Sequence, residues 1–274
     1  MKKKKRIIRC ALGVGLLAVT AWVLWANTAL EQNAYTLSCN KLPQEFDGYR
    51  IAHVSDLHNR KIGKDNSRLL DILEKAQPDI IAITGDLIDS RSTKVEVALD
   101  FAEQAVKIAP CYYVPGNHES RVEEYDALKV GLEKLGVTVL ENEQQALTVG
   151  DSSIQLLGVT DPDFPDQDLE AALTELHDPA QFTVLLSHRP ELFDTYSAQG
   201  VDLVLSGHAH GGQFRLPIVG GLYAPAQGFL PEYDAGLYTE GSTSMLVSRG
   251  IGNSLFPLRF NNRPEVILIE LNSA

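Results

Sequence analysis

The chain has 274 residues, 44% of them hydrophobic, which suits one large α/β domain with a substantial buried core. Its net charge is −12, but six basic residues precede the first acidic residue, Glu31, so residues 31–274 hold 18 basic against 36 acidic residues, a charge of −18. A domain this acidic repels nucleic-acid backbones, so we expect no nucleic-acid partner.

The first thirty residues predict a membrane anchor. Residues 1–9 are basic and residues 10–30 are uncharged. As a helix, the uncharged stretch would span about 31 Å, close to the hydrocarbon thickness of a bilayer. We expect a cytoplasmic basic segment followed by an uncleaved, single-pass signal anchor in the cell membrane, with an extracytoplasmic domain. A cleaved signal peptide is the alternative.

The three cysteines of the chain suggest neither a zinc knuckle nor a disulfide framework, because they lack CxxC spacing. Cys10 falls in the hydrophobic leader. Cys111 opens an apolar run, where we expect it to be buried. A Cys39–Cys111 bridge stays an alternative to two free thiols.

Strand-like and helix-like runs alternate after the anchor. Residues 31–48 read as a linker or an edge strand, and residues 49–274 as the main domain. In the first half of this domain the patterns predict three buried strands separated by two helices, which is typical of βαβ architecture. The strands are expected at 51–54, 80–83 and 111–114, and the helices at 67–76 and 95–108.

The second half of the domain continues this alternation with a different spacing. Its strands are expected at 138–140, 146–149, 154–159, 182–186, 202–205, 245–247 and 266–271, and its helix at 169–176. Two mixed sheets that face each other, flanked by helices, account for this order. The predicted fold class is therefore α/β, a four-layer α-β-β-α sandwich with an N-terminal transmembrane helix.

Side chains that bind divalent metals gather in short motifs, each at the end of a predicted strand. Asp, Asn and His with almost no Cys form a ligand set typical of Mn, Fe or Zn. One tetrahedral ion cannot use seven ligands, so we expect two divalent ions that share a bridging carboxylate. Two ions about 3.5–4 Å apart are the usual apparatus for hydrolysing phosphate esters. The candidate ligands are Asp56, His58, Asp86, Asn117, His188, His208 and His210.

Each motif taken alone has a simpler explanation. An Asp after a strand often caps a helix or a turn, and Gly85, Gly116 and Gly207 suit turns. The joint occurrence of the motifs, in order and at strand ends, favours the metal site. His53 and His177 lie outside the motifs. We expect His53 to be structural, and His177 to be a surface residue or one that interacts with the dipole at the C-terminus of a helix.

The motif order resembles the calcineurin-like metallophosphoesterase superfamily over residues 51–212. The matching motifs are Asp-x-His at 56–58, Gly-Asp at 85–86, Gly-Asn-His-Glu at 116–119, a lone His188 and Gly-His-x-His at 207–210. The resemblance implies that Asp86 and a hydroxide bridge the two metals. It also implies one metal on Asp56, His58 and His210, and the other on Asn117, His188 and His208.

The resemblance further implies a catalytic role for His118, which would lie beside the metals without binding them. It would act on the leaving-group oxygen or on the transition state. Glu119 would orient His118 or cap the following helix. The implied reaction is attack of the bridging hydroxide on phosphorus, with no covalent enzyme intermediate.

The segments that follow the last ligands resemble a membrane-associated bacterial branch of this superfamily. Some members of that branch cleave the pyrophosphate of UDP-diacylglucosamine, and others are cell-envelope phosphodiesterases. We expect Arg215 and Arg249 to bind a substrate phosphate, with structural ion pairs as the alternative. The predicted substrate is an envelope or lipid-linked phosphodiester or pyrophosphate. The alternatives are a phosphomonoesterase that scavenges phosphate and a non-catalytic metal-binding scaffold.

Overall fold

The computed structural model describes residues 2–253 and 256–274. Met1 of the predicted leader and residues 254–255 of the predicted domain lie outside the described residues.

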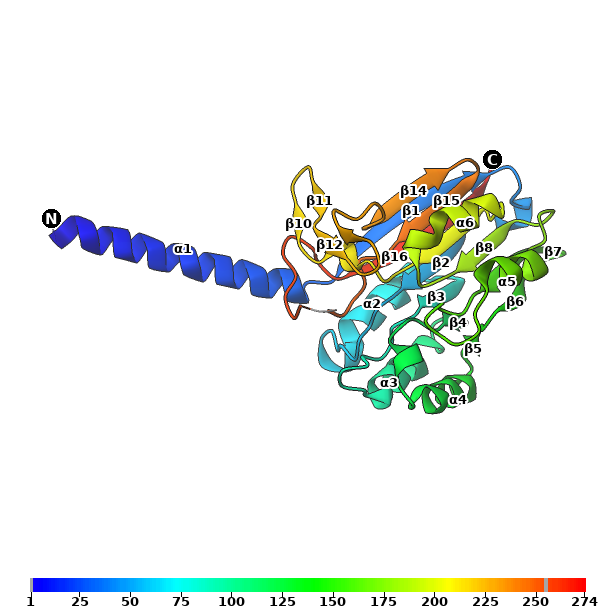
Figure 1. Cartoon of the computed structure of the whole chain (residues 1–274), viewed down its shortest axis with the longest axis horizontal. Coiled ribbons are helices and arrows are strands. Elements are labelled where there is room, and N and C mark those ends of the chain that lie inside the picture. Colours follow the sequence, from blue (N-terminus) through cyan, green and yellow to red (C-terminus); the bar gives the residue numbers. More distant parts are fainter. Residues whose placement is uncertain (1, 254–255) are drawn as a thin grey trace.

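Two six-stranded mixed sheets form the centre of the domain (Figure 1). The first contains β1 (Glu31–Cys39), β2 (Tyr49–Val54), β3 (Ile80–Thr84), β4 (Cys111–Val114), β5 (Thr138–Val139) and β16 (Glu265–Ser273). Its order is β1-β16-β2-β3-β4-β5, with all neighbours parallel except β16 and β2. Residues 31–39 thus form the edge strand, paired with β16 from Glu31↔Glu265 to Cys39↔Ser273.

The second sheet has antiparallel pairs at both edges and parallel pairs between them. Its strands are β6 (Glu143–Val149), β7 (Ser152–Gly158), β8 (Thr183–Leu186), β9 (Leu203–Ser206), β14 (Gly236–Glu240) and β15 (Thr243–Val247). They lie in the order β14-β15-β9-β8-β7-β6.

Alternating side chains along the strands build three apolar cores that define four layers. On β3, Ile80 and Ala82 face the core between the sheets, whereas Ile81 and Ile83 face the helices. The outer face of the first sheet carries α2 (Ser67–Ala76), α3 (Val95–Ala105) and α4 (Tyr125–Leu135), and that of the second carries α5 (Leu169–Leu176) and α6 (Phe193–Ala198). The predicted four-layer α-β-β-α sandwich is confirmed.

One helix ends earlier than the sequence pattern suggests. The prediction extended it from 95 to 108, but α3 ends at Ala105, with Val106 as its C-cap. Residues 106–108 form a turn. Pro110 follows shortly after, and a proline disfavours helical geometry at the residue before it.

A single long helix, α1 (Lys2–Thr28), projects from the domain with the N-terminus at its far end (Figure 1). Its 27 residues extend about 40 Å at 1.5 Å per residue. Among the helices that the structure describes, it is the one long and apolar enough to cross a membrane. Its length and composition fit the predicted anchor, and its orientation stays a prediction.

Two small hairpins follow the last predicted ligands and lie between α1 and the sheets (Figure 1). In the first, β10 (Arg215–Leu216) pairs with β11 (Gly220–Gly221). In the second, β12 (Tyr223–Ala224) pairs with β13 (Gly228–Phe229).

Candidate metal centre

The seven predicted ligands follow the carboxyl ends of β2, β3 and β4 in one sheet and of β8 and β9 in the other. The chain turns sharply there, and five of the seven residues have a positive φ, which non-glycine residues rarely adopt. Such backbone strain concentrates at functional sites. These five are Asp56 (53°), His58 (45°), Asp86 (53°), His208 (65°) and His210 (49°).

Four buried residues form a first cluster of ligand atoms. The Nε2 atoms of His58 and His210 lie 3.2 Å apart. His210 Nε2 is 3.3 Å from Asp56 Oδ1, and His58 Nε2 is 3.4 Å from Asp86 Oδ2. One ligand atom from each residue lies within 4.8 Å of all the others, which is close enough for one ion to contact all four.

The second cluster forms around His188. Its Nε2 lies 3.2 Å from Asp86 Oδ2, from His208 Nδ1 and from Asn117 Oδ1. Asp86 therefore belongs to both clusters through the same oxygen. That oxygen has the position of a carboxylate that bridges two neighbouring ions.

The hydrogen bonds of these residues indicate whether their free atoms can bind a cation. His188 Nδ1 donates to the Thr84 carbonyl at 2.8 Å, which leaves the Nε2 lone pair facing the cluster. The Asn117 carbonyl oxygen faces only other acceptors. Turning this amide over would let its nitrogen donate to His188 and His208, but would remove its oxygen from the cluster. Converging acceptors fit a divalent metal, because a cation supplies the positive charge that they share.

The charges of the site lead to the same conclusion. Burial would raise the pKa of the Asp86 carboxyl, but His188 outweighs it and holds that pKa well below its usual value. Burial would likewise lower the pKa of His188, yet Asp86 raises it to about 10. The buried carboxylates thus strongly favour positive charge nearby, and divalent ions would provide it.

His118 lies at the edge of the clusters, with its ring 4.6 Å from that of His58. The Ser90 backbone N–H donates to His118 Nδ1 at 3.0 Å, so the proton of the neutral ring sits on Nε2. Burial lowers the pKa of His118, which favours this neutral form. The ring is therefore a hydrogen-bond donor through Nε2.

Glu119 has neither of its two expected roles. Its buried carboxylate accepts backbone N–H bonds from Asp86 at 2.9 Å, Gly116 at 2.8 Å and Ile88 at 3.1 Å. It thereby ties the loop that carries Asp86 to the loop that carries Asn117. Sequence reasoning missed this role because the donors at 86 and 88 are more than thirty positions away.

Replacing Glu119 with alanine should lower the free energy of unfolding by several kcal/mol, since three buried N–H groups lose their acceptor at about 1–3 kcal/mol each. Glu119→Gln keeps one acceptor oxygen and should cost less. Thermal unfolding of the full chain in detergent measures both variants. If the Tm of Glu119→Ala matched that of the wild type within about 1 °C, Glu119 would not have this role.

Two glycines in the motifs allow the backbone to pass close to the carboxylates of predicted metal ligands. A Cβ at Gly207 would lie 2.4 Å from Asp56 Oδ2, and one at Gly116 would lie 2.4 Å from Asp86 Oδ1. These glycines therefore do more than form turns: any side chain at either position would displace a predicted metal ligand.

The pocket at the metal centre contains two arginines that the sequence analysis did not assign. It encloses about 540 Å³, part of it open to solvent, and Arg121, Arg189 and His118 line it together with several predicted ligands. Arg189 Nη1 lies 3.3 Å from His208 Nε2. Both arginines pair with Asp163, at 2.6 and 2.8 Å. Their positions in the sequence could have indicated this, because Arg189 directly follows His188 and Arg121 follows Glu119 by two residues.

Arg215 and Arg249 are not among the residues that line this pocket. Arg215 pairs with Asp234 at 3.0 Å and donates to the Gly211 carbonyl at 3.0 Å. Arg249 pairs with Glu31 at 2.9 Å and with Glu265 at 2.7 Å. They line a separate hollow together with Asn33, Tyr35 and Glu265.

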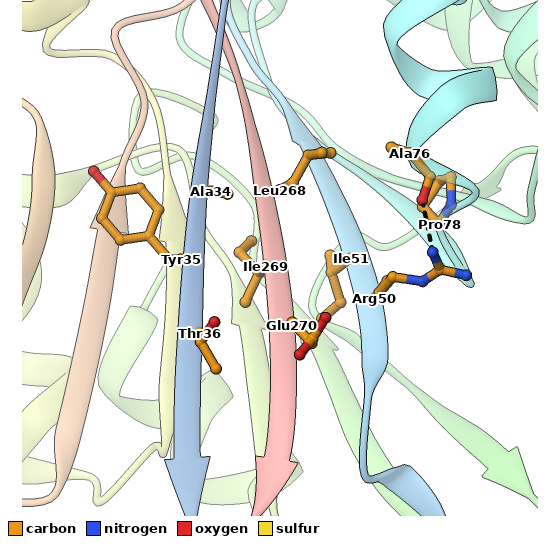
Figure 2. Close-up of a pocket in the computed structure, with 10 residues that line it drawn as sticks. All are labelled: Ala34, Tyr35, Thr36, Arg50, Ile51, Ala76, Pro78, Leu268, Ile269 and Glu270. Carbon is orange, nitrogen blue, oxygen red and sulfur yellow. Dashed lines mark hydrogen bonds between the residues drawn. The ribbon is translucent and has the colours of Figure 1, made fainter.

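A further cavity, with a largely apolar lining, lies elsewhere. Figure 2 shows it between β1, β16, β2 and the turn after α2, with Arg50 bonded to the Ala76 carbonyl at 3.1 Å. It contains none of the predicted ligands. His53 is also away from the metal clusters: it is buried, and its Nε2 lies 2.8 Å from the Thr84 hydroxyl. His177 is the C-cap of α5 and thus lies at a helix C-terminus, where the sequence analysis placed it.

The fold and the shared carboxylate define a class of domain built to hold two neighbouring divalent metals. The family model of calcineurin-like phosphoesterases matches residues 49–212, so the chain belongs to this family.

Two curated relatives agree with this assignment. The chain is 32% identical to the uncharacterized metallophosphoesterase YkuE of Bacillus subtilis, over 89% of this chain and 86% of the relative. It is 31% identical to phosphodiesterase YaeI of Escherichia coli, over 81% and 82% of the two chains. The solved structure of TT1561 of Thermus thermophilus shares the fold, with a TM-score of 0.52 at 14% identity over 74% of this chain and 90% of that one.

Proposed function

We propose that this chain is a metal-dependent phosphodiesterase that hydrolyses a phosphodiester or pyrophosphate of a cell-envelope or lipid-linked substrate. The observation that carries the proposal is Asp86 Oδ2, which lies 3.4 Å from His58 Nε2 and 3.2 Å from His188 Nε2. Membership of the phosphoesterase family supports the reaction class. The likeness to phosphodiesterase YaeI supports a diester over a monoester.

The metals would be two divalent ions, Mn, Zn or Fe. Asp56, His58 and His210 would hold one, Asn117, His188 and His208 the other, and Asp86 both. When bound, such ions lower the pKa of water and neutralise charge on phosphoryl oxygens. His118 would donate a hydrogen bond from Nε2 to a phosphoryl oxygen in the transition state or, when its ring is protonated, transfer the Nε2 proton to the departing oxygen.

Arg121 and Arg189 are suited to hold the phosphate group of the substrate. Both line the pocket, and Arg121 is the more accessible, with 52% of its side chain exposed. A guanidinium can bond two phosphate oxygens at once. The assignment of Arg215 and Arg249 to this role stays a prediction from sequence, and their carboxylate partners favour a supporting role instead.

Arg121→Ala should raise KM for an anionic phosphodiester about tenfold, the value expected for losing a charge-assisted hydrogen bond. Arg249→Ala is the matched comparison, because it also removes one guanidinium. Steady-state kinetics with bis(p-nitrophenyl) phosphate separate the two assignments. A raised KM in Arg249→Ala alone would favour the sequence-based assignment over the pocket-based one.

We propose that α1 anchors the chain in the cell membrane, with the catalytic domain outside. The basic residues before the apolar stretch support this orientation, since such residues stay on the cytoplasmic side. An active site there would meet envelope phosphodiesters rather than cytoplasmic nucleotides.

Hydrolysis of bis(p-nitrophenyl) phosphate and of p-nitrophenyl phosphate by the metal-loaded full chain tests the proposed reaction. A higher kcat/KM for the diester is the expected result. Preference for the monoester would support phosphate scavenging. Turnover of neither substrate by folded, metal-loaded protein would favour the binding scaffold.

A further inference from the structure

Exposed apolar side chains gather on one part of the domain. Outside α1, the described residues include ten large apolar side chains that are exposed, and eight of them fall in two short segments. Scattered exposed apolar residues are ordinary, but a contiguous group marks a contact surface. The eight, which we call the collar, are Leu216, Ile218, Val219, Phe229, Leu230, Phe256, Leu258 and Phe260.

The two segments of the collar are joined to each other. Gln213 donates to the carbonyls of Phe256 at 3.0 Å and Leu258 at 2.8 Å. The Arg215 N–H donates to the Phe260 carbonyl at 3.0 Å. The collar is therefore one connected surface, although its segments are well separated in the chain.

One segment of the collar packs against the end of α1 that enters the domain. The Trp22 and Phe260 rings pack edge to face, with centroids 4.9 Å apart. Asn27, at the end of α1, donates to the Arg259 carbonyl at 2.9 Å and accepts from the Arg259 N–H at 2.7 Å. The hairpin of β10 and β11 is held to the same segment, because Arg215 bonds to Phe260. These contacts fix the collar next to the membrane surface that α1 would leave.

The tip of the β10–β11 hairpin carries an exposed apolar residue in an unfavourable backbone conformation. Ile218 is fully exposed, with a φ of 72°, where turns favour glycine or asparagine. A β-branched residue with a positive φ is strained. The turn thus places an isoleucine at the most exposed position of the tip despite this strain. Val219 lies beside it and is 54% exposed.

The second hairpin connects the collar to the metal pocket. Pro225 and Ala226, in the turn between β12 and β13, line the pocket. Phe229, at the end of β13, is 83% exposed and packs on Tyr223 with ring centroids 5.5 Å apart. The three residues from Ala226 to Phe229 span about 10 Å at most. The pocket therefore opens close to the collar.

We propose that the collar is a second membrane-contact surface, which enters the interfacial region of the bilayer around α1 and presents the metal pocket to the phosphate groups of lipid headgroups. The bilayer is the partner, because α1 leaves the domain beside the collar and would hold it at the lipid surface. Apolar side chains in that position enter the boundary between headgroups and acyl chains. The choice of headgroup phosphates as substrate class rests on the proposed phosphodiesterase function, whereas the membrane contact does not.

Depth-dependent fluorescence quenching tests this contact without any need for turnover. The full chain, with Cys10→Ser and Cys39→Ser, would carry a single environment-sensitive label at Val219→Cys, Phe229→Cys or Ala226→Cys, in phosphatidylcholine nanodiscs. The matched control is Val130→Cys on α4, because this valine is 46% exposed but lies outside the collar. All four positions are exposed, so the label replaces no buried side chain.

Lipids spin-labelled on the acyl chain should quench the probes at 219 and 229 about threefold or more relative to the probe at 130, since collar side chains would reach the acyl-chain boundary. Lipids spin-labelled on the headgroup should quench the probe at 226 more than the probe at 130. Equal acyl-chain quenching at 219 and 130 would overturn the membrane contact. Headgroup quenching at 226 no greater than at 130 would overturn the placement of the pocket. Turnover of bis(p-nitrophenyl) phosphate by the preparations labelled at 219 and 229, outside the pocket, reports separately on the proposed function.

Discussion

Asp86→Ala should lower kcat/KM for a phosphodiester by about a thousandfold or more, because it removes the one oxygen that both ligand clusters share. The same carboxylate also holds the neighbouring loop, since Oδ1 accepts the His118 backbone N–H at 2.9 Å. Loss of Asp86 should therefore reduce the metal content as well as the rate. Metal analysis and steady-state kinetics of the full chain measure the two effects.

Asp202→Ala provides the matched control for Asp86→Ala. Asp202 is another largely buried carboxylate, but it lies just before β9, at the end of the strand opposite the metal centre, and pairs with Lys41 at 2.8 Å. Its loss should lower stability and leave metal content and kcat/KM unchanged. An Asp86→Ala protein that retains two metals and the wild-type rate would rule out the bridging role.

His118→Ala should lower kcat by about a hundredfold or more and leave both metals in place, which is the effect expected for losing a positioned proton donor. The reason is the tautomer: the Ser90 N–H occupies Nδ1, so Nε2 carries the proton toward the pocket. The loss should be greater for a diester with an alkyl leaving group than for a nitrophenyl diester, because the alkoxide needs the proton more. Kinetics with two such substrates, together with metal analysis, test this.

His118→Gln retains an N–H donor and should recover part of the lost rate. His53→Gln is the control for altering another buried histidine, since His53 bonds Thr84 and lies outside both clusters. A fall in metal content in His118→Ala would make His118 a ligand instead. An equal loss with both leaving groups would argue against proton donation to the leaving group.

The sequence predicted the buried strands of the sandwich well because their burial is extreme, whereas the largely exposed edge strand β14 was not predicted. All five residues of β3 are buried, so this strand reads as a continuous apolar run between turn residues. The ligands were predictable for a related reason: they follow such strands directly. By contrast, α4 was not predicted, although Gly136 in the left-handed conformation ends it in the usual way.

Contacts between distant segments were beyond sequence reasoning. The carboxylate of Glu119 bonds to backbone groups of another loop, and no local pattern reveals such partners. Arg249 was expected at a phosphate, but its partners Glu31 and Glu265 come from opposite ends of the chain. The exposure of apolar side chains could not be predicted from the sequence either. Phe229 is an apolar residue that a sequence pattern would assign to the core, but the fold leaves it at the surface.

The most direct test of the account is metal titration of the full chain in nanodiscs, after stripping with a chelator, while hydrolysis of bis(p-nitrophenyl) phosphate is followed. The account predicts two ions of Mn or Zn per chain, with activity that rises as the second site fills. Full activity with one ion bound, or no activity in folded protein with both sites filled, would contradict it.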